Sequence, residues 1–172
     1  KDKVDIIQLP TEFQNGFVAF VIGAKHATKR LPEHKMIEFI RSLQRPVVLL
    51  GGKEDIERGE AVVNGIKTGA VFNGCGKYSL NGSASLIEQS ELVITHDTGL
   101  MHIAAALRKK IISIWGNTVP EFGMYPFLPY GDGESVILEN KTLDCRPCSK
   151  IGYDRCPKKH FRCMNDLVLK LP

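Results

Sequence analysis

The sequence lacks the features that mark several common protein classes. It has no apolar run of about 18 residues, so it holds no candidate for a membrane-spanning helix. No G-x-G-x-x-G run follows its first apolar segment, and the P-loop pattern G-x-x-x-x-G-K-[ST] is missing. These absences argue against a dinucleotide-dependent oxidoreductase and a P-loop nucleotide hydrolase. Internal repeats and low-complexity tracts are missing too, which argues against a repeat protein.

The composition is that of one globular domain with a sizeable core. The chain has 172 residues, of which 43% are hydrophobic and 24% are charged. Its net charge is +4, and outside the clusters at 25–30, 108–110 and 158–162 the basic residues are scattered. We interpret the surplus as a mild attraction to anionic ligands or to an anionic membrane face, and we expect no nucleic-acid partner.

The start of the chain has the character of a linker. It does not begin with Met, and its first apolar strand begins only at Phe17. We therefore expect a piece of a longer protein, in which residues 1–16 lead in from a missing N-terminal domain.

Apolar strands alternate with helical stretches along the rest of the chain. Strand patterns lie at 17–22, 46–50, 70–72, 92–94, 110–115 and 134–138, and helical patterns at 32–43, 54–66, 79–89 and 100–107. Such alternation is typical of βαβ units and of a parallel sheet covered on both faces. We predict an α/β fold, a Rossmann-like three-layer domain of about six parallel strands over residues 17–140. Residues 141–172 form a Cys-rich segment with a C-terminal helix that packs on this domain.

The stretch 91–107 organises the chain. A short apolar strand at 92–94 leads to Asp97-Thr98-Gly99, and strong helix formers follow from Leu100. The polar residues therefore lie at the carboxyl end of a strand and the amino end of a helix, which is where open α/β sheets bind ligands. The free N–H groups and the dipole of the helix favour an anion such as a phosphate there.

A purely structural interpretation of this turn is an ordinary helix cap, because Asp and Thr are common capping residues. Two features favour a ligand site. Asp97 and Thr98 are both capping types although one cap is enough, and His102 adds a titratable group one turn into a helix that otherwise reads as buried. His102 alone would be interpreted as structural.

Three other loops end on the same edge of the predicted sheet. The first, residues 23–32, is basic, and its cations suit a diphosphate; the alternative is a solvated loop. The second, residues 51–55, carries two carboxylates that suit ribose hydroxyls; the alternative is a favourable charge at a helix start. The third, residues 116–126, has the glycine and aromatic residues to wall a base or a sugar, or to form an ordinary connection. Their shared location is worth more than any one motif.

Two consecutive segments carry a family resemblance. Residues 96–107, HDTGLMHIAAAL, followed by 111–120, IISIWGNTVP, resemble the donor-site signature of glycosyltransferase family nine, the heptosyltransferase-like enzymes. The resemblance implies the C-terminal, donor-binding domain of a GT-B-type enzyme of lipopolysaccharide core biosynthesis. It implies transfer of a heptose from an ADP-linked donor, with inversion, to the lipopolysaccharide core or a related glycan. It also implies that the general base lies in the missing N-terminal domain, so that the catalytic residues are unknown here and the piece alone is inactive.

The resemblance also assigns residues to the donor. Lys29 best matches a basic residue that lines the donor phosphates, with Lys25 and Thr28 beside it. Glu54, with Asp55 as its rival, matches a residue that meets the nucleoside. The backbone at Thr98, Gly99 and Leu100 meets the diphosphate. Asp97 faces the sugar, His102 supports the turn or the sugar, and Asn117 lies in the loop that walls the site. His96 departs from the small polar residue that family members often have there, which leaves the sugar open.

Four of the five cysteines lie close together in sequence, at Cys145, Cys148, Cys156 and Cys163, while Cys75 stands alone. Four thiols with a Cys-x2-Cys pair suit a structural zinc site, although the spacing is not that of a standard zinc finger. Two disulfides and free thiols are the alternatives. We call this group the cysteine cluster, interpret it as a structural element that stabilises the C-terminal segment, and assign it no role in catalysis. By the same resemblance, we expect the transfer itself to require no cofactor.

Two other functions remain open at this point. A nucleotide-sugar epimerase of the same architecture would bind a UDP-sugar and need no acceptor. A module built on the cysteine cluster and the basic residues 158–162 would bind nucleic acid or protein, but it leaves the polar sheet edge unexplained. We expect a cytoplasmic protein, peripheral at the inner face of the cytoplasmic membrane, where lipid-linked acceptors lie.

Overall fold

The computed structural model describes residues 3–5, 8–67, 70–128 and 134–170. Its centre is one sheet of six parallel strands in the order β3-β2-β1-β4-β5-β6. The strands are β1 (Val18–Val21), β2 (Val47–Leu50), β3 (Val71–Asn73), β4 (Leu92–His96), β5 (Ile111–Trp115) and β6 (Ser135–Glu139). The predicted Rossmann-like α/β fold is confirmed, including the number and direction of the strands.

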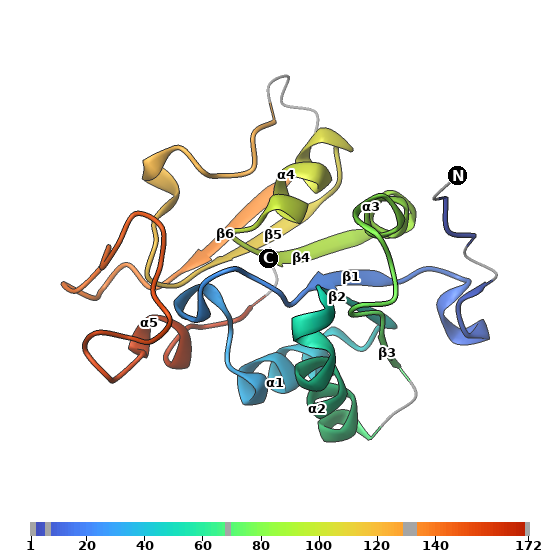
Figure 1. Cartoon of the computed structure of the whole chain (residues 1–172), viewed down its shortest axis with the longest axis horizontal. Helices are drawn as coiled ribbons and strands as arrows, with labels where there is room; N and C mark the ends of the chain where they lie inside the picture. Colours follow the sequence, from blue (N-terminus) through green and yellow to red (C-terminus); the bar gives the residue numbers. More distant parts are fainter. Residues whose placement is uncertain (1–2, 6–7, 68–69, 129–133, 171–172) are drawn as a thin grey trace.

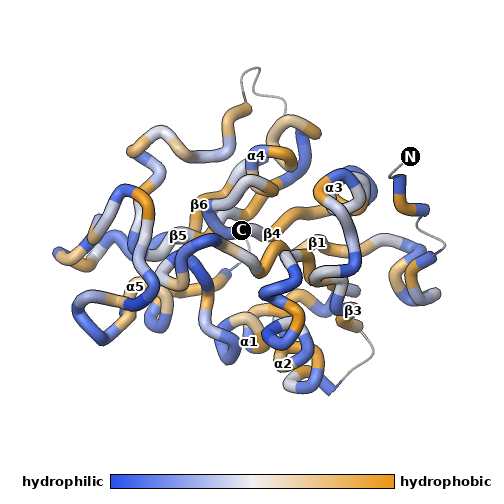
Figure 2. Tube along the Cα trace, viewed as in Figure 1, coloured by the Kyte–Doolittle hydropathy of each residue, from blue (hydrophilic) through white to orange (hydrophobic). Residues whose placement is uncertain are grey.

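Helices cover both faces of the sheet (Figure 1). On one face lie α1 (Glu33–Leu43), α2 (Ile56–Ile66) and the short α5 (Arg162–Asn165), and on the other lie α3 (Leu80–Gln89) and α4 (Gly99–Ala106). The central strands β1 and β2 are buried at every residue because both of their faces are covered. In Figure 2, α1 and α2 alternate between hydrophobic and hydrophilic residues, as expected for helices with one buried face.

Short 3-10 turns connect several of these elements. They span Thr11–Phe13, Ala27–Lys29, Lys53–Asp55 and Pro120–Phe122. No helix in the described ranges is long and apolar enough to cross a membrane.

The described part of residues 1–16 packs on the domain. Val4, Leu9 and Phe13 are buried in the same core as α3 and α4. The backbone N–H of Val4 donates to Ser85 Oγ at 3.1 Å, and Gln89 Nε2 donates to the Val4 carbonyl at 2.8 Å. The start of the chain is therefore held against α3, and the N-terminal domain expected before it stays a prediction. Residues 1–2 and 6–7 of that expected linker lie outside the described residues.

The C-terminal segment is irregular apart from α5. Cys163, Met164 and Leu167 are buried in the core that α1 and α2 share, so this segment covers the sheet beside them. Residues 171–172 of the expected Cys-rich segment lie outside the described residues. The division of the chain at residue 140 stays a prediction.

Candidate functional site

The sheet places a cleft at the point where the strand order reverses. β1 lies between β2 and β4, and the chain leaves β1 and β4 in opposite directions across the sheet. A cleft of about 490 Å³ opens at this point. Its lining comes mainly from three places, the loop after β1, the loop after β2 and the amino end of α4. The lining residues are Val21, Gly23, Ala24, Lys25, Arg30, Gly51, Gly52, Glu54, Asp55, Leu80, Thr98, Gly99 and Leu100. Open α/β folds bind their ligands at this switch point, and we call it the donor cleft.

The amino end of α4 faces this cleft without a side-chain cap. Thr98 is the N-cap residue, but its side chain makes no capping hydrogen bond, and its buried Oγ1 has no partner among the described residues. The first N–H groups of α4 therefore keep their capacity to bind an anion. A Cβ added to Gly99 would meet no atom within 4 Å, so the space in front of this backbone is open. The purely structural interpretation of the turn, a capped helix, does not describe this geometry.

Asp97 is held in place from two sides instead of capping α4. Its Oδ2 accepts from Lys29 Nζ at 2.6 Å and from Thr118 Oγ1 at 3.2 Å. Lys29 and Asp97 are both largely buried, with side chains 11% and 6% exposed. The cation predicted to neutralise a diphosphate therefore forms an ion pair with the predicted sugar-facing carboxylate, and neither side chain lines the donor cleft. Their contacts with a donor stay predictions.

The loop after β2 separates its two carboxylates. Glu54 is exposed and lines the donor cleft, whereas Asp55 is buried, and its Oδ2 accepts from the backbone N–H of Gly52 at 3.0 Å. A Cβ at Gly23 or Gly51 would collide with the Asp55 carboxylate, so both glycines are needed for this packing. Asp55 thus holds the loops together, and Glu54 is the carboxylate free to meet a ligand.

The side chains of the loop after β1 point in two directions. Lys25 and Arg30 line the donor cleft, and Arg30 Nε donates to the Ala24 carbonyl at 2.7 Å. Thr28 is buried and turns away from the cleft. Its hydroxyl accepts from the Tyr153 N–H at 2.8 Å and donates to the Tyr153 carbonyl at 3.0 Å. Thr28 therefore joins this loop to the C-terminal segment, and its predicted donor contact stays untested.

His96 is a buried structural group. Its Nε2 accepts from the backbone N–H of Leu31 at 3.0 Å, and its ring packs beside Phe20. Burial, aided by the positive charge of Arg58, lowers the pKa of His96 to about 3, so the ring is neutral at physiological pH. Arg58 Nη2 donates to the Leu31 carbonyl. His96 and Arg58 together fix the end of the loop after β1, and His96 does not line the cleft.

The loop after β5 is fastened by a residue that the sequence did not single out. Arg146 donates to the carbonyls of Gly116, Asn140 and Thr118 and forms an ion pair with Glu139 at 3.0 Å. Thr118 in turn donates to the Asp97 carboxylate. Arg146 therefore helps to hold the turn at residues 97–99, which we call the central turn. Arg146 lies 49 residues after Asp97 in the sequence, and no local pattern connects them.

The last two predicted site residues differ in exposure. The Asn117 side chain is buried, and neither its Nδ2 nor its Oδ1 has a hydrogen-bond partner in the described part of the chain. The backbone carbonyl of Asn117 accepts from the Cys148 N–H at 3.1 Å. His102 is exposed on α4 and does not line the cleft. The expectation that its helix is otherwise buried was too strong, because Ala106 and Leu100 are also accessible to solvent.

All five cysteines are free thiols in the structure. Within the cysteine cluster, Cys145 Sγ lies 3.8 Å from His160 Nε2, and the Cys148 thiol donates to the Cys145 carbonyl at 2.8 Å. Burial raises the pKa of Cys163 to about 11 and also raises that of Cys148. No three metal-ligating side chains are gathered around one point in the part of the chain that the structure describes. Four thiols have the right chemistry for zinc, but this arrangement is not a ready-made tetrahedral site, and structural zinc stays a prediction.

The arrangement as a whole suits an anionic ligand with a sugar attached. Helix N–H groups and the cations Lys25 and Arg30 face a cleft in which Glu54 offers a hydrogen-bond acceptor. Sequence reasoning found three of these four elements. It did not separate Arg30 from the other basic residues of the loop, because only the fold shows which of them face the cleft.

Comparison with known proteins gives a consistent result. The family model described as Glycosyltransferase family 9 (heptosyltransferase) matches residues 2–158. Lipooligosaccharide heptosyltransferase 2 of Haemophilus influenzae is 29% identical over 168 residues, which cover 89% of this chain and 47% of that enzyme. The structure of Escherichia coli ADP-heptose lps heptosyltransferase II superposes with a TM-score of 0.69 at 25% identity, over 93% of this chain and 48% of that one.

A second solved structure, the Escherichia coli heptosyltransferase WaaC with ADP, superposes with a TM-score of 0.59 at 28% identity. The match covers 76% of this chain and 40% of that one. The chain therefore spans less than half the length of the relatives described here. These relatives carry heptosyltransferase names, and none is named as an epimerase or a nucleic-acid-binding protein.

Proposed function

The chain belongs to glycosyltransferase family 9, the heptosyltransferases, and we propose that it is the donor-binding domain of an inverting enzyme that transfers heptose from ADP-heptose to the lipopolysaccharide core or a related glycan. The observation that carries the proposal is the donor cleft, where an uncapped helix start, two cations and an exposed carboxylate face one space. Two of the relatives support the nucleotide, because their names include ADP or ADP-heptose.

The central chemical demand of such a transfer is to stabilise the departing diphosphate as negative charge develops on it. The first residues of α4 line the cleft, and Gly99 leaves the approach to their N–H groups open. Lys25 and Arg30 add positive charge from the loop after β1. Fixed dipoles and cations of this kind stabilise developing charge with little reorganisation, and no metal ion is needed for it.

The remaining contacts follow from the same geometry. We assign the ribose hydroxyls to Glu54, and the support is that it is the exposed carboxylate at the end of a strand next to the switch point. Asp97, fixed by Lys29 and Thr118, supports the turn beside the sugar. The acceptor hydroxyl must lose its proton to a general base, which we place in the other half of the enzyme. We propose a cytoplasmic location at the inner face of the membrane for the whole enzyme.

A thermal-shift titration of the 172-residue chain tests this proposal. Saturation with ADP at about 100 times its dissociation constant stabilises a two-state domain by about 2.7 kcal/mol. We expect shifts with ADP and ADP-heptose and much smaller shifts with UDP and a UDP-sugar. A response to UDP compounds alone would favour the epimerase instead.

A matched pair of variants adds residue-level resolution. Glu54→Gln should weaken ADP binding by about tenfold, the equivalent of about 1.4 kcal/mol for a hydrogen bond to a charged acceptor. Glu57→Gln makes the same change three residues away, at an exposed position that does not line the cleft. It should leave the affinity for ADP unchanged. Equal effects of the two variants would refute the role of Glu54.

A further inference from the structure

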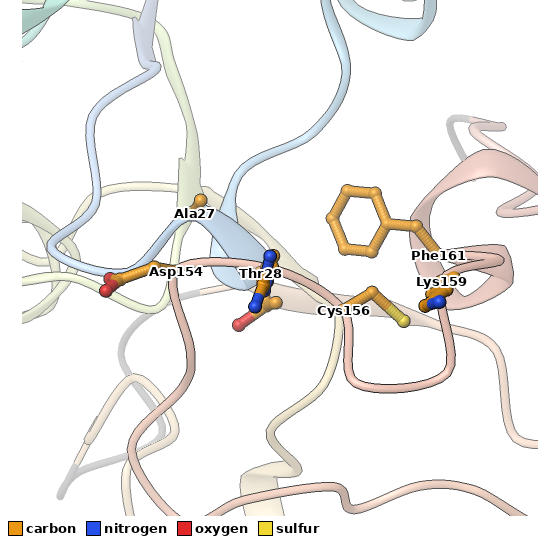
Figure 3. A pocket seen from close by; sticks show the side chains of 7 residues that line it. Ala27, Thr28, Asp154, Cys156, Lys159 and Phe161 are labelled. Atoms are coloured by element: carbon orange, nitrogen blue, oxygen red, sulfur yellow. The ribbon is translucent and has the colours of Figure 1, made fainter.

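A second pocket lies on the other side of the loop that follows β1. It has a volume of about 340 Å³, and we call it the Phe161 pocket. Its lining joins the 3-10 turn after β1 to the C-terminal segment, as Figure 3 shows, and comprises Ala27, Thr28, Asp154, Arg155, Cys156, Lys159 and Phe161. None of these residues lines the donor cleft. The volume is at the lower end of the range typical for small-molecule sites.

The net positive charge of the chain lies in the segment that supplies most of the lining of this pocket. Residues 150–162 contain five basic residues and one acidic residue, a net charge of +4, so the rest of the chain is neutral overall. Arg155 and Lys159 line the pocket, and neither forms an ion pair among the contacts described. Arg162, by contrast, pairs with Asp166 at 2.7 Å. Asp154 is the one acidic residue in the lining, so the pocket has a net positive charge that invites an anion.

An aromatic ring completes the pocket. Phe161 is partly buried against the core, and in Figure 3 its ring projects toward the space between Cys156 and the turn that carries Thr28. Phe161 and Lys159 both have left-handed backbone angles, with φ of 47° and 62°. Such angles are costly for residues with large side chains and are concentrated at functional sites. Both residues line the pocket, one on either side of His160 in the sequence.

The pocket is tied to the central turn of the donor site. Thr28 makes three hydrogen bonds with the backbone of Tyr153, which hold the C-terminal segment against the loop after β1. The next residue, Lys29, reaches Asp97 at 2.6 Å. The Phe161 pocket and the central turn are therefore joined by two adjacent residues of one loop, with the donor cleft beyond it.

We propose that the Phe161 pocket binds a sugar that carries a phosphate or carboxylate group. Arg155 and Lys159 bind the anionic group, and the ring of Phe161 packs against the C–H face of the sugar. This inference rests on the proposed function, in which such a sugar belongs to the acceptor glycan. The loop after β1 then separates the donor from an anionic unit of the acceptor.

Amide NMR titrations of the ¹⁵N-labelled chain test the assignment, with mannose 6-phosphate as the probe and ADP as the reference ligand. We expect mannose 6-phosphate to shift the amide signals of Thr28, Lys159 and Phe161 in a saturable manner. Inorganic phosphate should bind more weakly at the same residues, and mannose should not bind. ADP should shift signals at Gly99 and Leu100, which reports on the proposed function separately.

A charge-matched pair of double variants identifies the cations. Arg155→Ala with Lys159→Ala should raise the dissociation constant for mannose 6-phosphate by about tenfold or more, since charge-assisted contacts are lost. Lys158→Ala with Lys170→Ala removes the same charge from exposed residues outside the pocket. This control should change the dissociation constant for mannose 6-phosphate much less. ADP binding should be unaffected in both variants.

Three results would overturn the inference while ADP binding persists. The first is the absence of a saturable shift with mannose 6-phosphate. The second is equal binding of inorganic phosphate, which would show that the sugar is not recognised. The third is binding of the basic segment to phosphatidylglycerol vesicles without any response to mannose 6-phosphate, which would identify a lipid-facing surface. Loss of ADP binding alone would contradict the proposed function and not the presence of the pocket.

Discussion

The buried ion pair between Lys29 and Asp97 gives the sharpest test of how the central turn is held. We consider the substitutions Lys29→Met and Asp97→Asn, alone and together. Lys29→Met leaves the Asp97 carboxylate nearly inaccessible to water, and the hydroxyl of Thr118 is then its one hydrogen-bond partner among the residues that the structure describes. Because an uncompensated buried charge is costly, the single variant should be strongly destabilised, and the double variant should recover part of the loss.

The magnitude follows from the geometry. Two unit charges 2.6 Å apart attract each other by about 6 kcal/mol at an effective dielectric constant of about 20. Desolvation of both groups cancels much of this attraction, so the pair contributes far less than the gross figure to the free energy of unfolding. Removing one partner should nevertheless cost about 3 kcal/mol. We expect a coupling energy of about 2 kcal/mol in the double-mutant cycle.

Equilibrium unfolding in guanidinium chloride measures these differences from the transition midpoints, provided that the slopes agree. The exposed pair of Lys110 and Glu134, with side chains 62% and 71% exposed, is the control. Its cycle should give a coupling below about 1 kcal/mol, as is usual for surface ion pairs. Additive effects of Lys29→Met and Asp97→Asn would refute the reasoning, and would return Lys29 to the role of a free cation for the donor phosphates.

Four further predictions concern pH, the cleft and the thiols. The free energy of unfolding should fall as the pH drops from about 6.5 toward 3, because the pKa of His96 is lowered to about 3 only in the folded chain. His96 alone should account for up to roughly 4 to 5 kcal/mol of this loss. Urea titrations at several pH values should show a shallower pH dependence for His96→Asn than for the parent, and parallel curves would contradict this account. Gly99→Val should leave the melting temperature within about 2 °C of the parent but weaken ADP binding by about tenfold or more, because the new side chain enters open space in front of the helix start; unchanged affinity would show that no ligand approaches there. Iodoacetamide should modify Cys75 and Cys163 only after unfolding, since burial raises their pKa values to about 12 and about 11. Mass spectrometry measures the modification, and a modified Cys75 or Cys163 in native protein would contradict this prediction. If the cysteine cluster holds structural zinc, protein purified without chelator should contain close to one equivalent, and less than about one-tenth of an equivalent would exclude it, given how tightly structural zinc is held.

Local sequence patterns were sufficient for the elements and for the edge of the sheet at which the cleft lies. Near-continuous apolar runs such as the one at 17–22 predict strands buried on both faces, and the structure has a strand at each predicted place. The polar residues that follow those runs had to converge, because the carboxyl ends of parallel strands share one edge. For this reason Gly99 and Leu100 could be assigned to a ligand site before the fold was known.

The roles of individual side chains at that edge were decided by the tertiary structure. Glu54 and Asp55 are adjacent and chemically alike, and both line the cleft, yet Glu54 is exposed whereas Asp55 is buried against Gly23 and Gly51. Lys29 finds its partner 68 residues away and Thr28 finds its partner 125 residues away. Sequence spacing says nothing about such distant pairs, because they depend on which loops the fold brings into contact.

The amino-acid sequence by itself therefore determined the kind of chain this is, since periodicity, turn residues and a compact motif are local properties. It led to the parallel α/β domain, to the edge of the sheet at which the donor cleft lies and to the family. The tertiary structure alone decided which cations face the donor cleft, that Asp97 is fixed by Lys29 and Thr118, and that a separate basic pocket forms around Phe161. The physical reason is that charge pairing, burial and pocket shape arise from long-range contacts, which become defined only when the chain is packed.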